Sequence, residues 1–265
     1  MYNVQFPDTN ISHAYFAKFE KDMLLVKKVF LTVQGEGPFA GVPAVFVRLA
    51  GCNRGAKTGP TSCSFCDTDF RIEGVRPISV AKLVQQVRDI RGGATLVVIT
   101  GGEPMLQPAL IPFIEALLPG TTMEVQIESN GDRLLPYWGE VRDKVHLVVS
   151  PKLSGREQPR YLPLREDVLA AADSLKFLID HRPESFYHQV PDYADKWRRE
   201  GTGHVFVSPI AVYKRPVAEG EIASAWDMGL IDSALTRKNY AYAAKLAIER
   251  DFVVSIQQHL FLSAE

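Results

Sequence analysis

Three cysteines, Cys52, Cys63 and Cys66, fall within one short segment of the chain. The segment 53–62 between the first two is rich in polar residues and glycine, so these thiols do not resemble small hydrophobic residues of a core. A structural disulfide is rare in a reducing compartment and would leave one thiol unpaired. The grouping of the thiols therefore predicts a shared soft metal.

The spacing of the thiols favours an iron–sulfur cluster over structural zinc. Zinc in structural sites takes four ligands, commonly two C-x₂-C pairs or one pair with nearby histidines. Only Cys63 and Cys66 form such a pair, and His13 and His146 are distant in sequence. Three thiolates suit a 4Fe–4S cluster whose fourth iron is left open for a ligand. A zinc-stabilised binding module, with Cys63 and Cys66 as half a site, is the non-enzymatic alternative.

A second motif, Thr100-Gly101-Gly102-Glu103-Pro104, directly follows the apolar run 96–99. Its two glycines allow another group to approach the backbone closely, and the exposed backbone N–H and C=O groups can bind a polar ligand. The motif lacks the Lys-Ser/Thr ending of a phosphate-binding loop and the G-x-G-x-x-G spacing of a dinucleotide site. A nucleotide-phosphate role is therefore disfavoured.

Alternating segments along the chain predict an α/β fold. We expect strands at 24–33, 44–49, 96–100, 123–128, 145–150, 175–180, 204–208 and 252–257, and helices at 79–90, 107–118, 184–200 and 233–250. Short apolar strands that alternate with helices are typical of a mostly parallel sheet. We expect one domain over 1–265, built as a partial (β/α) barrel, with irregular segments near 153–172 and 210–232.

Polar or glycine-rich turns follow four of the predicted strands, at 34–37, 101–104, 129–131 and 150–152. Sites in parallel α/β folds assemble at the carboxyl ends of the strands. We therefore expect the four turns to converge on one pocket.

The composition narrows the classes of function. The chain has a net charge of −1, so it shows no basic footprint for nucleic acid and no polybasic patch for a membrane surface. Its apolar runs are too short to span a bilayer, and residues 1–20 contain no signal-peptide core. We expect a cytoplasmic protein that binds neither nucleic acid nor membrane.

Taken together, the motifs resemble the radical S-adenosylmethionine (SAM) enzymes, and within them the 7-carboxy-7-deazaguanine synthases of queuosine-precursor biosynthesis. The resemblance is carried by the segments 33–37, 47–53, 63–69, 100–104, 128–131, 149–152 and 255–259. It implies a lyase with a radical SAM core that rearranges 6-carboxy-5,6,7,8-tetrahydropterin by ring contraction with loss of ammonia. A radical SAM enzyme that activates a protein glycine is the alternative within the superfamily.

The resemblance also implies how the cofactors are held. Cys52, Cys63 and Cys66 would bind the 4Fe–4S cluster, and S-adenosylmethionine would chelate the open iron. An external reductant would supply one electron, and reductive cleavage of that cofactor would give a 5′-deoxyadenosyl radical. This radical would abstract hydrogen from the substrate. The residues expected to contact S-adenosylmethionine are Phe65, Asp67, Gly101, Gly102, Glu103, Ser129, Ser150, Lys152 and Ser208.

A further set of residues would bind the substrate and a Mg²⁺ ion. Thr68 matches the hydroxyl ligand of Mg²⁺, an ion that shares its oxygen ligands with substrates and water. Glu36, Arg48 and Lys152 are expected to be catalytic, and a forked Arg suits a carboxylate. The expected substrate contacts are Val33, Gln34, Gly35, Glu36, Arg48, Thr100, His259 and Glu265. The resemblance further implies a homodimer.

The chain departs from the family pattern at three places. The first gap between cysteines is ten residues, whereas most radical SAM enzymes have C-x₃-C-x₂-C. Leu260 stands where the family often has Lys, and Ser208-Pro209 stands where it often has Gln-Pro. Taken singly, Arg48 could instead form a surface ion pair, His259 could be structural, and Thr68 and Lys152 could be solvated.

Overall fold

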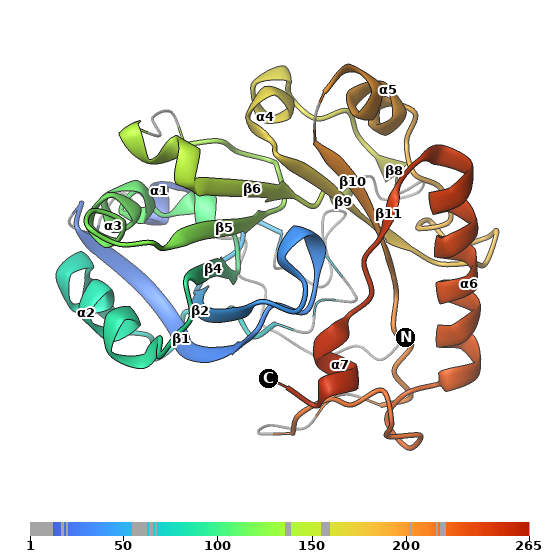
Figure 1. Ribbon diagram of the computed structural model, residues 1–265, viewed down its shortest axis with the longest axis horizontal. Helices are drawn as coiled ribbons and strands as arrows, with labels where there is room; N and C mark the ends of the chain where they lie inside the picture. The colour runs from blue at the N-terminus through green and yellow to red at the C-terminus, as the bar shows by residue number, and fades with distance from the viewer. Residues whose placement is uncertain are drawn as a thin grey trace.

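A computed structural model of the protein describes residues 13–16, 19, 21–54, 63, 66, 68–135, 139–154, 160–201, 203–215, 217 and 221–264. Within this part of the chain, one nine-stranded sheet has the order β11-β10-β9-β6-β5-β4-β2-β1-β3 (Figure 1). Its strands are β1 (Met23–Val33), β2 (Pro43–Leu49), β3 (Pro77–Ser79), β4 (Leu96–Gly101), β5 (Glu124–Ser129), β6 (Val145–Val149), β9 (Ser174–Ile179), β10 (His204–Pro209) and β11 (Val253–Val254). Neighbouring strands from β2 to β11 are parallel, and β1 is antiparallel to β2 and β3, so the predicted mostly parallel sheet is confirmed.

The described helices are α1 (His13–Phe16), α2 (Val80–Ile90), α3 (Leu110–Leu117), α4 (Glu166–Ala171), α5 (Tyr193–Glu200), α6 (Ser233–Arg250) and α7 (Gln258–Leu262). Helix α6 has the predicted bounds, because the carboxylate of Asp232 caps it by accepting from the backbone N–H groups of Ala234 and Leu235. The hydroxyl of Ser79 likewise caps α2 by accepting from the N–H of Lys82. Short 3₁₀ turns lie at Gly37–Phe39, Pro104–Leu106 and Gly139–Lys144.

Two predicted helices begin later than expected, in each case after a proline. The helix predicted over 107–118 begins at Leu110, because Gln107 precedes Pro108 and has an extended backbone. The helix predicted over 184–200 begins at Tyr193, two residues after Pro191. A proline disfavours the helical region for the residue before it, so both early starts were wrong.

Two further predictions need correction. The segment predicted as irregular over 153–172 contains α4 and a small antiparallel pair, β7 (Leu153–Ser154) and β8 (Arg160–Tyr161). Elements this short show too little periodicity to be found from sequence. The strand predicted over 252–257 ends at Val254, because the chain then turns toward the segment that follows β1.

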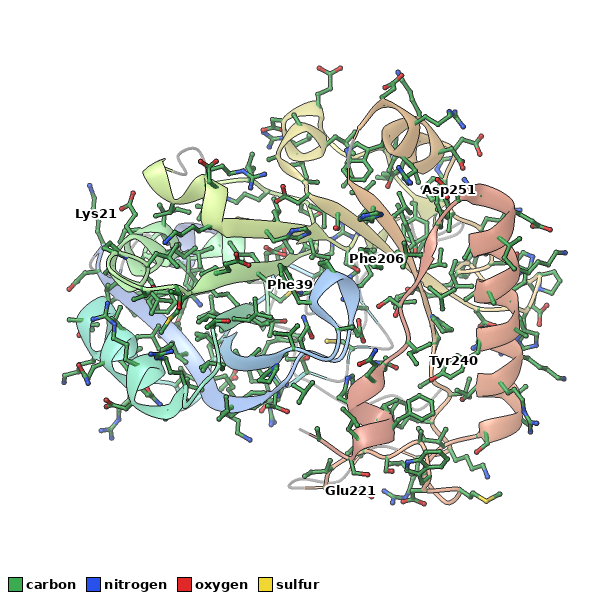
Figure 2. The ribbon with its side chains drawn as sticks, in the orientation of Figure 1. Lys21, Phe39, Phe206, Glu221, Tyr240 and Asp251 are labelled. Atoms are coloured by element: carbon green, nitrogen blue, oxygen red, sulfur yellow. The ribbon has the colours of Figure 1, made fainter. Side chains whose placement is uncertain are left out.

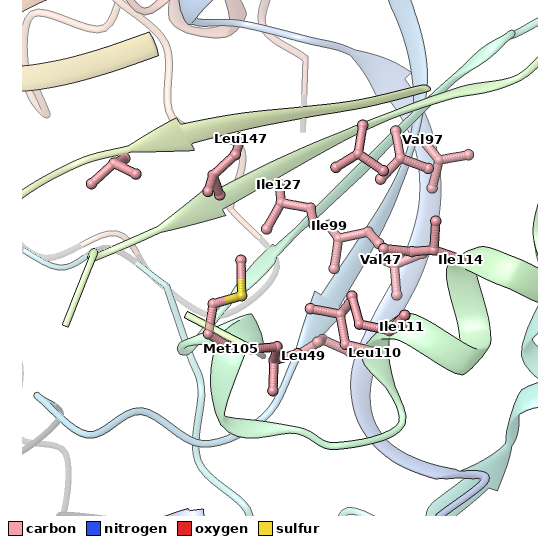
Figure 3. Packing of buried hydrophobic residues seen from close by; sticks show 14 of the residues in the cluster. Val47, Leu49, Val97, Ile99, Met105, Leu110, Ile111, Ile114, Ile127 and Leu147 are labelled. Carbon is pink, nitrogen blue, oxygen red and sulfur yellow. The ribbon is translucent and has the colours of Figure 1, made fainter. Parts of the chain in front are cut away.

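The outer face of the sheet packs against the helices. Side chains alternate between the two faces of a strand. Figure 3 shows this face packing against the 3₁₀ turn after β4 and against α3, with Val47, Leu49, Val97, Ile99, Ile127 and Leu147 meeting Met105, Leu110, Ile111 and Ile114. Almost all of these side chains are fully buried, and burying each one contributes on the order of 1.5–3 kcal/mol. This packing fixes the strands whose ends carry the motifs.

The polarity of the inner face of the sheet changes along the strands. At the amino ends of β2 and β4 it is apolar, with Ala44, Leu96 and Val98 in one small cluster. Toward the carboxyl ends it becomes polar, and Arg48 of β2 is paired with Thr100 of β4. The alternation and the register place three further polar side chains on this face, namely Gln126, Glu128 and Lys176.

The segments that follow β1 and β11 are bridged by hydrogen bonds, which makes the sheet a partial barrel. The N–H of Gly37, after β1, donates to the hydroxyl of Ser255, after β11, at 2.8 Å. The N–H of Gln258 donates to the carbonyl of Gly35 at 2.9 Å. Helix α7 contacts α6, since the rings of Tyr240 and Phe261 lie 6.2 Å apart. Figure 2 labels Tyr240, on the α6 side of this contact. Among the described helices, none has the length and apolar character needed to cross a membrane.

Candidate active site

The three cysteines lie beyond the carboxyl end of β2. Cys52 follows that strand after Ala50 and Gly51, and the N–H of Cys66 donates to the carbonyl of Cys63 at 3.2 Å. All three side chains are half-buried. Burial raises the pKa of the Cys52 thiol, and the charges of Cys63 and Cys66 raise it further. The thiol of Cys52 also accepts from the backbone N–H of Arg54 at 3.4 Å.

The donor set of the three thiols has the chemistry that the predicted cluster requires. All three cysteines are free thiols. In a 4Fe–4S cluster with one open iron, each of three cysteines binds a different iron. Thiolates are soft ligands that suit iron–sulfur clusters.

The turn after β4 lies directly against the cysteine segment. The N–H of Gly102 donates to the carbonyl of Leu49 at 2.9 Å, and the N–H of Glu103 donates to the carbonyl of Gly51 at 2.8 Å. Gly101 has a φ of +114°, which favours glycine. A Cβ atom on Gly102 would stand 1.8 Å from the carbonyl oxygen of Gly51, so only glycine fits there.

The carboxylate of Glu103 joins this turn to the turn after β5. It accepts from the hydroxyl of Ser129 at 2.8 Å and from the backbone N–H groups of Asn130 at 2.7 Å and Met105 at 3.0 Å. Burial raises the pKa of Glu103 to about 7, although the three donors act in the opposite direction. A buried carboxylate at this end of the sheet suits a cationic ligand group such as an amine.

Ser150 and Lys152 complete this side of the site. The N–H of Ser150 donates to the carbonyl of Ser129 at 2.7 Å, so the turns after β5 and β6 are joined. The ammonium of Lys152 donates to the hydroxyl of Ser150 at 2.7 Å and to its carbonyl at 2.8 Å. Burial lowers the pKa of Lys152, and the charge of Cys63 partly offsets that effect. The turns after β4, β5 and β6 thus converge as predicted.

Arg54 fastens the cysteine segment to this site, and the sequence reasoning missed it. Its guanidinium forms a two-pronged ion pair with Asp132, after β5, and donates to the carbonyl of Leu153 at 3.0 Å. Asn53 also donates to Asp132, at 2.8 Å. The sequence could have identified Arg54, because it is a forked cation two residues after a cysteine that was predicted to bind metal.

The turn 34–37 does not join the others at the carboxyl ends. Strand β1 is antiparallel to β2, so Val33 is paired with Pro43, the first residue of β2. The opposite end of β2, at Leu49, is six residues away, or roughly 20 Å. The prediction that all four turns converge in the same way was therefore wrong for 34–37. This turn approaches the inner face from the bridged edge of the sheet.

Glu36 nevertheless reaches the polar part of the inner face. Its carboxylate accepts from the ammonium of Lys176, on β9, at 2.8 Å. Lys176 also forms an ion pair of 2.8 Å with Glu128, on β5. Burial would raise the pKa of Glu36, but the charges of Lys176 and His259 lower it overall. Neither Glu128 nor Lys176 was predicted, although both are charged residues inside apolar strands, which is a recognisable signal.

Arg48 and Thr100 lie side by side on the same face. Arg48 is half-buried, its guanidinium carbon lies 5.2 Å from the centre of the Phe30 ring, and its buried Nε has no hydrogen-bond partner within the described residues. Arg48 is thus partly enclosed at this face of the sheet. Gln34 is buried, and its side-chain oxygen accepts from the N–H of Glu36 at 3.3 Å.

His259 lies on α7 against the turn 34–37. A Cβ atom on Gly35 would stand 2.2 Å from the imidazole, so Gly35 allows this close contact. The neighbouring Leu260 is buried with Ala211 and Leu230, so the leucine at this departure from the family pattern is part of a small core.

The remaining predicted residues are placed as follows. The carbonyl of Thr68 lies 3.8 Å from the sulfur of Cys66, which puts Thr68 beside the cysteines. Ser208 is buried on β10, paired with Leu178 of β9. Phe65, Asp67 and Glu265 lie outside the described residues.

Comparisons with known proteins agree with this geometry. Residues 47–150 match the family model of the Radical SAM superfamily. The chain is 33% identical over 250 residues to the 7-carboxy-7-deazaguanine synthase of Rickettsia prowazekii, covering 91% of this chain and 89% of the relative. It is also 33% identical to the synthase of Rhodospirillum rubrum, over 83% and 88% of the two chains. The solved structure of QueE from Escherichia coli shares the fold, with a TM-score of 0.57 and 22% identity over 95% of this chain and 100% of that one.

Proposed function

Because the chain belongs to the 7-carboxy-7-deazaguanine synthase family of radical SAM enzymes, we propose that it converts 6-carboxy-5,6,7,8-tetrahydropterin into 7-carboxy-7-deazaguanine. The conversion is a ring contraction that releases ammonia. Product and ammonia together contain all the atoms of the substrate, so the overall change needs no oxidant. The relatives give no support to a glycine-radical activating enzyme or to a zinc-binding module.

As a radical SAM enzyme, the protein uses a 4Fe–4S cluster and S-adenosylmethionine. When bound, these groups supply one-electron chemistry that starts with hydrogen abstraction from the substrate. In our proposal Cys52, Cys63 and Cys66 hold the cluster. Burial of the thiols works against free thiolates, and iron supplies the charge that stabilises them.

We assign the S-adenosylmethionine site to the joined turns after β4, β5 and β6. Gly101 and Gly102 leave room for the cofactor against the backbone, and the Glu103 carboxylate attracts its amino group. Ser129 and Ser150, which are linked through the backbone, would contact the remainder. Lys152, whose ammonium donates to Ser150, would contact the cofactor from the turn after β6.

The substrate is assigned to the polar part of the inner face. The forked guanidinium of Arg48 suits the substrate carboxylate, and Thr100 lies next to it. Glu36 and Gln34 would accept from the N–H groups of the pterin, and His259 would close the site from α7. The observation that carries this assignment is the buried Nε of Arg48, which lacks a partner among the described residues and would gain one from an anion.

We further propose that Thr68 binds Mg²⁺ beside the substrate carboxylate, since its hydroxyl is the hard ligand that Mg²⁺ prefers. We also propose a cytoplasmic homodimer that receives electrons from an external one-electron reductant. Four exposed apolar side chains support an interface near α7, namely Ile222, Trp226, Met228 and Leu262. Analytical ultracentrifugation of the protein would show a monomer if this interface is not used.

Anaerobic reconstitution tests the proposed function. The protein, loaded with iron and sulfide and then reduced, is incubated with S-adenosylmethionine, Mg²⁺ and the carboxypterin. We expect 7-carboxy-7-deazaguanine, and an Arg48→Lys variant should raise KM for the carboxypterin about tenfold, because lysine lacks the planar fork. A colourless zinc protein without sulfide, or 5′-deoxyadenosine formed without the deazaguanine, would contradict the proposal.

A further inference from the structure

Lys176 joins two carboxylates from distant parts of the chain. Its ammonium lies 2.8 Å from Oε2 of Glu36, in the turn after β1, and 2.8 Å from Oε2 of Glu128, on β5. The three side chains are only 11%, 18% and 14% exposed, respectively. The cation therefore connects the bridged edge of the sheet with its centre, inside the proposed substrate site.

The two carboxylates depend on that cation to stay ionised together. Because both contact the same nitrogen, they can be no more than about twice 2.8 Å apart. Two carboxylates so close in a poorly hydrated site share a proton unless a cation lies between them. Burial would lower the pKa of Lys176, yet the charges of Glu128 and Glu36 hold it well above its usual range, so the ammonium is permanently charged.

Other polar groups face this triad but do not replace the cation. Lys152, after β6, interacts with both Lys176 and Glu128, and His259 of α7 and Tyr240 of α6 interact with Glu36. The amide of Gln126 donates to Glu128 at 2.5 Å. The one lysine among these groups is Lys152, and its ammonium donates to Ser150.

We infer that Lys176 is a positioning residue that keeps Glu36 and Glu128 ionised and in place as a pair of hydrogen-bond acceptors for the pterin. The inference rests on the proposed function. The aminopyrimidinone edge of a pterin presents N–H donors, and an ionised carboxylate only accepts hydrogen bonds. A protonated carboxyl group would place an O–H donor opposite those donors and weaken binding.

The test compares Lys176→Met with Lys176→Arg in anaerobic turnover assays between pH 5.5 and about 8.5. Lys176→Met removes the cation, so a proton remains on the carboxylate pair to a higher pH. We expect KM for the carboxypterin to rise about tenfold near pH 7, and the acidic limb of kcat/KM to move up by about one pH unit or more. Lys176→Arg should restore the profile of the unaltered protein. Lys196→Met, at an exposed lysine, is the control and should change neither quantity.

A control reaction separates this inference from the proposed function. Reductive cleavage of S-adenosylmethionine without carboxypterin should persist in Lys176→Met, because Lys176 forms its ion pairs with Glu36 and Glu128 and not with the residues assigned to that cofactor. If the unaltered protein forms no deazaguanine, the proposed function fails. If the unaltered protein forms deazaguanine and Lys176→Met has the same KM for the carboxypterin and the same pH profile, the inference is overturned.

A second variant covers the case in which Lys176→Met does not fold. Lys176→Met combined with Glu128→Gln removes one charge of each sign and leaves a single carboxylate. We expect this double variant to fold and to have a raised KM for the carboxypterin. The acidic limb of its kcat/KM profile should lie at the same pH as in the unaltered protein. An acidic limb that is still displaced upward in the double variant would contradict a shared proton.

Discussion

The backbone of Gly102 lies directly against the carbonyl of Gly51, so closely that a Cβ atom at Gly102 would stand 1.8 Å from that oxygen. Through this contact, the turn after β4 packs directly against the segment that contains Cys52. The N–H of Glu103 donates to the same carbonyl at 2.8 Å. The two glycines therefore set the distance between the proposed cluster ligands and the proposed S-adenosylmethionine site.

Gly102→Ala should separate these two segments. The methyl group meets backbone and not a flexible side chain, so the turn must shift, at a cost of about 1–3 kcal/mol in stability. We expect S-adenosylmethionine binding to weaken at least about tenfold, measured by equilibrium dialysis. Gly93→Ala is the matched control, because nothing lies within 4 Å of its added Cβ. Equal binding by the two variants would contradict the assignment of this turn to the cofactor.

Cys63→Ala should abolish both the cluster and turnover. Removing one of three thiolates leaves too few ligands to retain the irons. Iron and sulfide analysis after anaerobic reconstitution, together with the visible absorbance of the cluster, measures the loss. The thermal unfolding of the iron-free proteins should be nearly unchanged, because the thiol is only half-buried. A variant that keeps full iron content and activity would remove Cys63 from the site.

Arg54→Met should loosen the cysteine segment without removing a ligand. The variant loses the ion pair with Asp132 and the bond to the carbonyl of Leu153, each contributing roughly 1.5–3 kcal/mol as a charge-assisted hydrogen bond. We expect slower reconstitution and faster loss of iron to a chelator. Arg71→Met, at an exposed arginine whose carboxylate partner is Asp69, serves as the control. Equal rates of iron loss in the two variants would show that Arg54 does not hold the segment.

Arg250 on α6 should stabilise the fold in a pH-dependent way. It forms an ion pair with Asp195 of α5, donates to the carbonyl of Val190 and lies over the ring of Phe252. The hydrogen bonds from Arg250 hold the pKa of Asp195 below its usual range. A lowered acid pKa contributes stability above the unfolded pKa of about 3.9, and this contribution is lost as the pH falls through the folded value.

Arg250→Met should therefore reduce the free energy of unfolding by about 1–2 kcal/mol at pH 7, and by less below about pH 4. Urea unfolding of the variant and of the unaltered protein, at pH 7 and below about pH 4, measures the difference in the free energy of unfolding. Arg165→Met removes an exposed pair with Asp167 and should change the free energy of unfolding far less than Arg250→Met at either pH. A pH-independent loss in Arg250→Met would mean that the ion pair contributes little.

Much of the scaffold could be predicted because its signals are local. Apolar runs and capping residues such as Ser79 and Asp232 mark the strands and helices directly. The late starts of α3 and α5 could also have been predicted, since Pro108 and Pro191 lie within the predicted helices. The short elements α4, β7 and β8 contain too few residues to show a period.

The site was harder to predict, because its assembly depends on strand direction. Local sequence does not show that β1 is antiparallel, and so the approach of Glu36 from the bridged edge was missed. Lys176 and Glu128 lie on strands that are separated by β6 in the sheet, and their side chains meet across it. The sequence shows that Lys176 and Glu128 are charged residues in apolar strands, but it does not show which residues they contact.

Isotope transfer tests the central claim most directly. The reduced, cluster-loaded protein is incubated with S-adenosylmethionine and with carboxypterin deuterated on its saturated ring carbons, and the nucleoside products are analysed by mass spectrometry. We expect deuterium in 5′-deoxyadenosine, together with 7-carboxy-7-deazaguanine and ammonia. A loaded protein that cleaves S-adenosylmethionine but forms unlabelled 5′-deoxyadenosine and no deazaguanine would contradict the assignment of this site to the carboxypterin.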